Sequence, residues 1–146
     1  KRGLNINVLR LQGRAHLFML YILLIKNRAD DWGGTVLNKK KINDIARHHI
    51  FPKEFLEKNL EIEEHESNEV LINNVSNITF IDSNVNKEIG DKSPEKYMKD
   101  YINSAKKHFI STDSDLWSIS QYTTFLQYRM KQIHSSGKKY FGDIFE

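Results

Sequence analysis

The 146-residue chain contains no cysteine and only two prolines. Without cysteine there can be no disulfide framework, no zinc ribbon and no thiol nucleophile, so any metal ion must be bound by His, Asp, Glu or Asn. Disulfides are typical of oxidising compartments. Their exclusion suits a reducing environment, and we expect a cytoplasmic protein.

Long apolar runs are also lacking. The longest extends from Leu17 to Ile25, which is far shorter than the roughly 20 residues that cross a bilayer. We therefore expect a buried helix there and no association with a membrane. The chain begins with Lys1 and has no signal peptide, so we expect its natural N-terminus to lie upstream, in a longer protein.

Charge of one sign is in only slight excess. The formal net charge is +3 and the pI about 9.0, which favours an anionic partner but is much milder than in a dedicated nucleic-acid-binding protein. The hydrophobic fraction of 39% and the length are ordinary for one soluble domain. We expect a single folded domain over residues 1–146.

Three longer helices are predicted from composition and spacing. The first covers residues 13–28 and ends at a turn. The second covers residues 94–110 and begins with Pro94, a residue favoured at the first helical position. The third covers residues 115–135 and is expected to stop before Gly137. The chain is therefore mostly helical.

Two short strands are predicted between the first two helices. One ends near Phe51, because Pro52 disfavours helix at the residue before it. The other is Asn77–Asp82, which is rich in β-branched and aromatic residues. One or two helical turns at Lys53–Lys58 and an acidic loop at Glu61–Glu69 connect them. We expect the strands to pair as a hairpin.

The adjacent histidines His48 and His49 carry the strongest chemical signal. Consecutive side chains on an extended backbone point to opposite faces, so one imidazole can bind a metal ion while the other acts as a base. This division of labour is what metal-assisted hydrolysis requires.

The surrounding pattern resembles the HNH (ββα-metal, His-Me finger) endonuclease family. The resemblance rests on His48-His49-Ile50-Phe51-Pro52, on Asn77-Ile78-Thr79-Phe80-Ile81 and on Asn86. It implies an α+β fold in which a ββα-metal finger, a two-stranded hairpin plus a helix, occupies about residues 45–97 of a mostly helical domain.

A closer resemblance extends the match in both directions. With Asp30-Asp31-Trp32-Gly33 before the histidines and Pro94-Glu95-Lys96-Tyr97 after Asn86, the chain is similar to the C-terminal nuclease domain of GmrSD-type restriction proteins. That resemblance implies an upstream NTPase or sensor domain and a function in defence against phage, often directed at modified DNA.

The resemblance also implies a role for each motif residue. His48 and Asn86 would bind a divalent cation, and His49 would be the general base. Asn77 would complete the catalytic group by organising the loop and orienting His49. Many relatives have Asp at the position of His48. The expected ion is Mg²⁺ or Mn²⁺, and an imidazole at this position shifts the preference toward Mn²⁺, Ni²⁺ or Zn²⁺.

Cations beside the motif are candidates for contacts with DNA. Lys53 and Lys87 adjoin the predicted catalytic positions, and Arg47 precedes the histidine pair, so all three are interpreted as phosphate-binding residues. The run Lys39–Lys41 is interpreted first as a solvated face. The remaining histidines, interpreted as structural or exposed, are His16, His65, His108 and His134.

The predicted function is that of a metal-dependent DNA endonuclease, the nicking or cleaving effector of a restriction or anti-phage system. An alternative is a catalytically inactive HNH-fold module that binds DNA or a protein. A third interpretation, a secreted nuclease toxin with its own immunity partner, shares the site but requires export.

Overall fold

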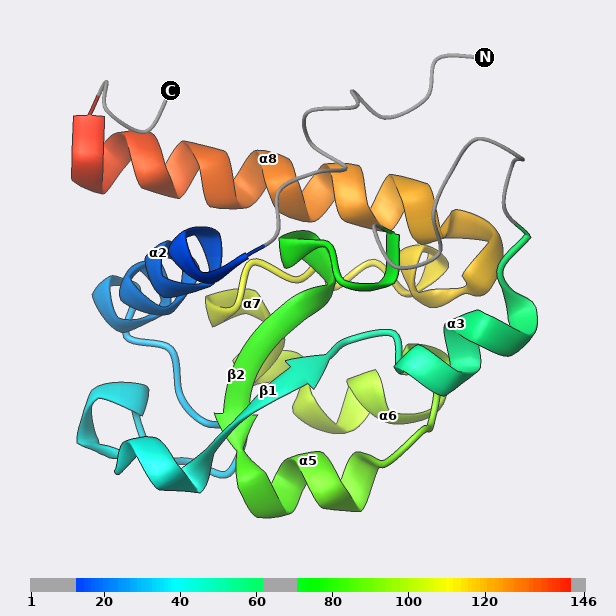
Figure 1. Cartoon of the computed structure of the whole chain (residues 1–146), viewed down its shortest axis with the longest axis horizontal. Helices are drawn as coiled ribbons and strands as arrows, with labels where there is room; N and C mark the ends of the chain where they lie inside the picture. The colour runs from blue at the N-terminus through cyan, green and yellow to red at the C-terminus, as the bar shows by residue number, and fades with distance from the viewer. Residues whose placement is uncertain (1–12, 62–70, 143–146) are drawn as a thin grey trace.

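Two antiparallel strands and the helix that follows them form the centre of the protein in the computed structural model, which describes residues 13–61 and 71–142. Strand β1 (Ile45–His49) pairs with β2 (Ile78–Asp82), and helix α5 (Ser83–Ile89) continues directly from β2 (Figure 1). The predicted α+β fold with a ββα unit is confirmed.

The register of the hairpin determines where the histidines point. His48 lies opposite Thr79 and His49 opposite Ile78. Because directly opposed residues share a face of the sheet, His48 and Thr79 point to one side and His49 to the other.

The turn after β1 brings the chain into a short helix. Pro52 ends the extended segment, and α3 (Lys53–Asn59) begins at the next residue. The helical turns predicted at Lys53–Lys58 are confirmed. Of the acidic stretch predicted as a loop, residues 62–69 lie outside the described part of the chain.

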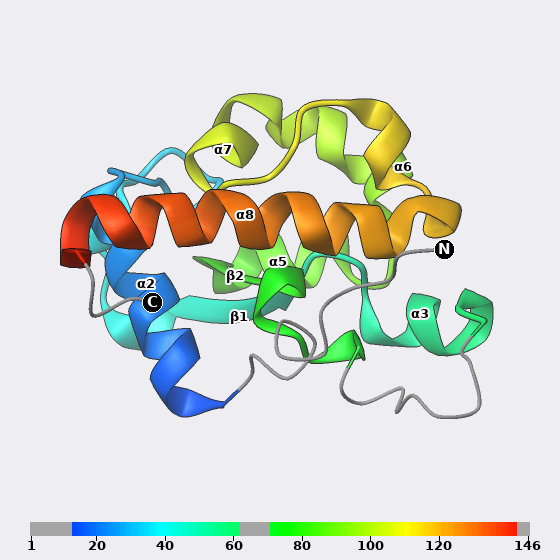
Figure 2. The same cartoon turned by 90° about the horizontal axis from the view of Figure 1, so that it is seen from above.

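The longer helices flank the hairpin. Helix α2 (Arg14–Lys26) confirms the helix predicted over residues 13–28. Figure 2 shows the long helix α8 (Tyr122–Phe141) crossing the hairpin, with α2 and α3 on one side and α6 and α7 on the other. None of the described helices combines the length and apolar character needed to cross a membrane.

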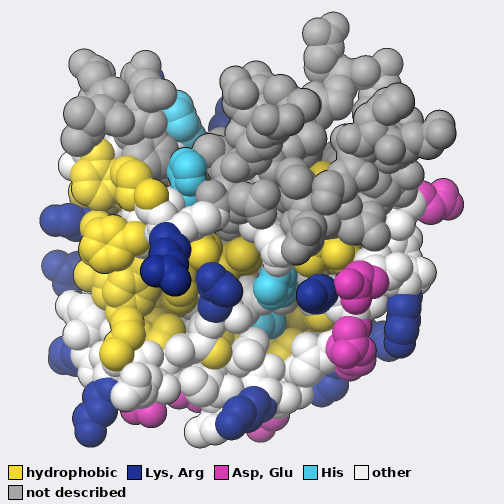
Figure 3. Space-filling view, in the orientation of Figure 1, with side chains coloured by type: hydrophobic (Ala, Val, Ile, Leu, Met, Phe, Trp, Pro, Cys, Tyr) yellow, Lys and Arg dark blue, Asp and Glu magenta, His cyan; other side chains and the backbone are white. Residues whose placement is uncertain are grey.

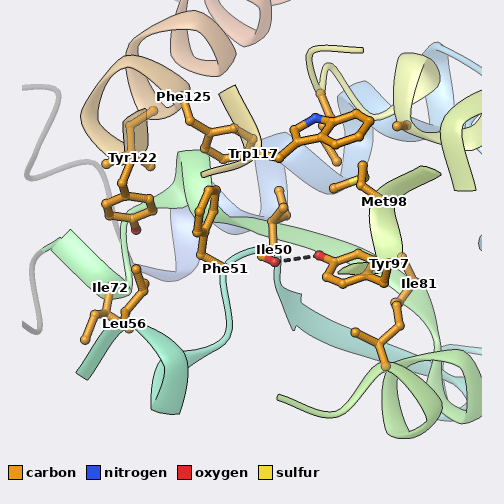
Figure 4. Packing of buried hydrophobic residues seen from close by; sticks show 14 of the residues in the cluster. Ile50, Phe51, Leu56, Ile72, Ile81, Tyr97, Met98, Trp117, Tyr122 and Phe125 are labelled. Carbon is orange, nitrogen blue, oxygen red and sulfur yellow. Dashed lines mark hydrogen bonds between the residues drawn. The ribbon is translucent and has the colours of Figure 1, made fainter. Parts of the chain in front are cut away.

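The hairpin separates two hydrophobic clusters. The larger contains Ile81 of β2 and the aromatic residues Phe51, Tyr122 and Phe125, which pack between the hairpin, α3 and the start of α8 (Figure 4). The smaller is built on α2, and Phe80 packs against it from the other face of β2. The position of the ββα unit is therefore fixed from both faces.

The single helix predicted over residues 94–110 is wrong in its continuity. Helix α6 (Pro94–Tyr97) passes into a 3₁₀ segment at Met98–Tyr101 before α7 (Ile102–Lys107) begins. Tertiary contacts explain the break. The Tyr97 hydroxyl donates a hydrogen bond to the carbonyl of Ile50, and the ring of Tyr101 stacks on Trp32. These contacts override the helical preference.

The helix predicted over residues 115–135 is wrong at both ends. The segment starts as 3₁₀ turns at Ser114–Trp117 and Ile119–Gln121, and α8 then runs past Gly137. Gly137 is buried inside the helix. The chain leaves the helix only at Gly142, whose φ of 65° lies in the left-handed region that glycine favours.

Candidate active site

His48 lies inside the protein at the end of β1. Its side chain is only 2% exposed. Nδ1 is 2.8 Å from Oδ1 of Asn86, and Nε2 is 3.1 Å from the Tyr97 hydroxyl. The edge of its ring meets Trp32 at a centroid distance of 5.3 Å. Both ring nitrogens are therefore engaged, and the ring has a fixed orientation.

The surroundings of His48 hold it in the neutral form at physiological pH. Burial lowers its pKa to about 4, against the opposing effect of the hydrogen bond with Asn86, and the charges of His49 and Arg129 lower it further. A neutral imidazole is the form that binds a metal ion.

Asn86 reaches His48 because α5 begins at a fixed point. Asp82 caps this helix by accepting hydrogen bonds from the backbone N–H groups of Asn84 (2.9 Å) and Val85 (3.2 Å). Lys40 then binds Asp82 at 2.6 Å and Asp31 at 2.9 Å. Strand β2, the helix start and the turn before β1 are thus joined at one point.

Lys40 lowers the pKa of both carboxylates that it binds, Asp31 and Asp82. The hydrogen bond from Lys40 holds the pKa of Asp82 below its usual value. Burial alone would raise the pKa of Asp31, but Lys40 and the backbone N–H groups of Thr35 and Gly33 outweigh it and lower that pKa. Lys40, part of the run interpreted as a solvated face, instead binds two carboxylates.

His49 is half-buried and differs from its neighbour. Its Nε2 donates a hydrogen bond to Oδ1 of Asn73 at 2.8 Å, which leaves Nδ1 of the neutral ring without a proton. Burial lowers the pKa of His49, and the nearby charges of Arg47 and Lys53 lower it further, although the bond with Asn73 acts in the opposite direction. Among the described residues, none hydrogen-bonds Nδ1 of His49.

Asn77 is fully buried and binds only backbone groups in the described part of the chain. Its Oδ1 accepts from the N–H of Phe51 (2.8 Å), and its Nδ2 donates to the carbonyls of Phe51 (3.1 Å) and Ile72 (3.0 Å). It ties the segment after His49 to the segment before β2. The direct contact that orients His49 comes from Asn73, and any part of Asn77 in catalysis stays a prediction.

The predicted phosphate-binding residues are exposed. Arg47, Lys53 and Lys87 all have accessible side chains, and the effect of the first two on His49 shows that they lie near it. Figure 3 shows histidine side chains at the centre of this face, with cationic side chains on either side and carboxylates gathered on the right.

A buried polar layer supports the hairpin from behind. His108 contacts the Thr79 hydroxyl at 2.6 Å and the carbonyl of Asp30 at 2.7 Å, in keeping with a structural histidine. Arg129 of α8 is fully buried, and burial lowers its pKa to about 9. It donates hydrogen bonds to the carbonyls of His108, Val75, Ser76 and Ile78.

The atoms that meet at His48 and Asn86 are suited to a metal ion. An imidazole nitrogen and a carboxamide oxygen are both metal ligands, and they face each other at 2.8 Å. Within residues 13–61 and 71–142 no group of three or more His, Cys, Asp or Glu side chains is placed to hold an ion. A metal site here therefore rests on two protein ligands.

Sequence reasoning missed two residues of this site. Asn73 directly follows the apolar residues Leu71 and Ile72, and an amide at the end of that apolar run was the only signal in the sequence. The helical spacing of Tyr97 predicts a core aromatic, and its ring is indeed buried. Nothing in the helical spacing indicates that its hydroxyl reaches His48.

Comparison with known proteins places the chain in a family. No curated protein and no solved structure gives a significant match. The family model described as GmrSD restriction endonucleases, C-terminal domain, matches residues 5–140, which carry both strands of the hairpin, α5 and the polar residues around His48 and His49. The chain belongs to the family of C-terminal domains of GmrSD restriction endonucleases.

Proposed function

We propose that this domain is a metal-dependent endonuclease that hydrolyses phosphodiester bonds of DNA, as the nicking or cleaving effector of a restriction or anti-phage system. The observation that carries the proposal is the contrast within β1. A buried neutral imidazole faces a carboxamide oxygen. The next residue is a half-exposed imidazole whose Nδ1 has no hydrogen-bond partner among the described residues.

His48 and Asn86 would hold the divalent cation, with Mg²⁺ or Mn²⁺ as the first expectation and Zn²⁺ or Ni²⁺ as alternatives. A cation bound there supplies positive charge to the phosphate and to the departing oxygen. The cap formed by Asp82 keeps Asn86 in place for this role. His48 needs no deprotonation at neutral pH, because its pKa is about 4.

His49 is the proposed general base. Its Nδ1 would take a proton from the attacking water, while Asn73 holds the N–H on the other ring nitrogen. The lowered pKa of His49 keeps it unprotonated near pH 7. The two imidazoles leave β1 on opposite faces, and the proposal requires that a phosphate bound at the end of the strand approach both the cation and His49.

Contacts with DNA are assigned to exposed cations. Arg47 and Lys53 lie close to the two histidines along the chain, and Lys87 follows Asn86. All three are exposed, and each is proposed to contact a phosphate. We also propose that the full protein is cytoplasmic and carries an upstream NTPase or sensor domain, which would limit cleavage to foreign or modified DNA.

Plasmid nicking tests the proposal. The wild-type domain should nick supercoiled plasmid in Mg²⁺ or Mn²⁺, and His49→Ala should reduce the rate by about 10²-fold to 10⁴-fold, the usual contribution of a general base. His134→Ala, which removes an exposed imidazole from α8, is the matched control and should cleave like wild type.

Two results would decide against the proposal. Equal residual nicking by wild type and His49→Ala would show that His49 is not the base. Tight DNA binding in chelator, without cleavage in any divalent metal, would favour the inactive binding module instead.

A further inference from the structure

The Tyr97 hydroxyl contacts both His48 of β1 and Ile50, which follows β1. It donates a hydrogen bond to the carbonyl of Ile50, drawn as the dashed line in Figure 4. The same oxygen is 3.1 Å from Nε2 of His48. Tyr97 is 3% exposed, and burial raises the pKa of its hydroxyl well above the usual value.

The neutral His48 ring has one proton for two contacts, so only one of its ring nitrogens can donate a hydrogen bond. A tyrosine hydroxyl has one proton, and that proton is given to Ile50. The contact with His48 is then a hydrogen bond only if Nε2 carries the proton of the neutral ring and donates it. In that tautomer the Nδ1 lone pair is directed at Oδ1 of Asn86 at 2.8 Å, and the two acceptor atoms face each other as they would around a shared cation; in the other tautomer, Nδ1–H would donate to that oxygen.

We propose that Tyr97 is a positioning residue that holds His48 as the Nε2–H tautomer and so keeps the Nδ1 lone pair facing Asn86 for a divalent cation. The inference rests on the proposed function, because it assumes that these two atoms are metal ligands. It adds a residue on α6 to a site otherwise built from the ββα unit.

The surroundings of the ring leave this role to Tyr97. Trp32 meets the His48 ring with its edge, at an interplanar angle of 67°. The nearby hydroxyl of Thr79 is already paired with His108. Among the described residues, only Asn86 and Tyr97 have polar atoms within hydrogen-bond distance of the ring nitrogens of His48.

The tautomer can be measured directly in the metal-free protein, without substrate. Long-range ¹H–¹⁵N correlation spectra distinguish a protonated ring nitrogen from one with a free lone pair. The wild type should show the proton of His48 on Nε2. A proton on Nδ1 would overturn the inference, and this result needs no variant that folds.

The variant Tyr97→Phe keeps the buried ring and removes the hydroxyl. We expect His48 to move toward the Nδ1–H tautomer, whose proton can be donated to Asn86, and the affinity for Mn²⁺ to fall by about 10-fold to 100-fold, as for other partners of metal ligands. The matched control is Tyr101→Phe. Its ring also contacts Trp32, but its hydroxyl makes no hydrogen bond with a described residue, so tautomer and affinity should not change.

The outcomes separate this inference from the proposed function. An unchanged tautomer in folded Tyr97→Phe would overturn the role of Tyr97, even if the domain cleaves DNA. A wild type that shows Nε2–H but binds no divalent cation would instead overturn the metal site. The expected shift of both tautomer and affinity supports the two together.

Discussion

The two histidines of β1 are neighbours in sequence, yet their surroundings have little in common. His48 is enclosed by Trp32, Tyr97 and Asn86, and both of its ring nitrogens have partners. His49 is half-buried, and among residues 13–61 and 71–142 its ring has one hydrogen-bond partner, Asn73, at Nε2. Position on opposite faces of a strand is enough to give one residue type two environments.

The difference shows how one strand can supply two kinds of chemistry. Burial keeps His48 neutral and rigid, which suits a metal ligand whose partners must be fixed in advance. His49 is neutral as well, but its Nδ1 can exchange protons with a water. Environments that separate the roles of two like groups are a recurrent feature of catalytic sites.

The largest loss of stability is expected at Asn77, which holds the segment directly after the two histidines. Asn77→Ala removes the carboxamide that binds two groups of Phe51 and one of Ile72. Each buried backbone group left without a partner costs about 1–3 kcal/mol, so the free energy of unfolding should fall by at least about 3 kcal/mol. Urea unfolding measures this loss. Asn84→Ala, at an exposed amide of α5, is the control. Equal stability of the two variants would show that the hydrogen bonds of Asn77 do not stabilise the fold.

The next largest effect is a loss of nicking rate that leaves metal binding unchanged, and it is expected at Asn73, the partner of His49. Asn73→Ala removes the acceptor that holds Nε2–H of His49, so the ring loses its orientation and the nicking rate should fall about tenfold, a fraction of what a general base contributes. Affinity for Mn²⁺ should be unchanged, because the hydrogen bond of Asn73 is to His49, whereas the ring nitrogens of His48 face Asn86 and Tyr97. A parallel loss of metal binding would mean that the two histidines are not independent.

A smaller effect, a loss of metal affinity, is expected at Asp82, which caps the helix that carries Asn86. Asp82→Ala removes the cap of α5 and one partner of Lys40, and loss of a cap costs about 1 kcal/mol. Mn²⁺ affinity should weaken because Asn86 loses its fixed position. Asp82→Asn can still cap the helix, so calorimetric titration of both variants separates the cap from the ion pair. Unchanged affinity in Asp82→Ala would show that Asn86 is positioned otherwise.

The smallest effect concerns protonation of His49. The base works unprotonated, so activity should fall as pH drops through its pKa, which lies below the usual 6.5. Arg47 and Lys53 lower that pKa, so Arg47→Gln and Lys53→Gln should move the acidic limb of the kcat/KM profile to higher pH. Lys58→Gln, at the other end of α3, should leave it in place. A shift to lower pH would contradict the assigned charges.

The ββα unit was predictable because its signals are local. Pro52 limits the first strand, β-branched residues mark Ile78–Asp82, and the polar positions of the motif fall at the strand ends. These features depend on neighbouring residues and on the preferences of the backbone. The strands, their pairing and the short helix α3 therefore follow from the sequence.

The remainder depends on contacts between distant segments. Tyr97 breaks its helix because its hydroxyl binds Ile50, and no helical periodicity contains that information. Gly137 remains helical because it is buried. Arg129 occupies a fully buried position on α8 and binds four carbonyls. The only indication in the sequence is that Arg129 lies among the apolar residues of this helix, next to Met130.

The central claim is that His48 and His49 do different work, and parallel titrations of their alanine variants test it most directly. Mn²⁺ binding and plasmid nicking should be measured on the same preparations of wild type, His48→Ala and His49→Ala. We expect His48→Ala to lose both properties, and His49→Ala to bind Mn²⁺ like wild type but to lose about 10²-fold or more of the nicking rate. Equal loss of Mn²⁺ binding in the two variants, or wild-type nicking by His49→Ala, would contradict it.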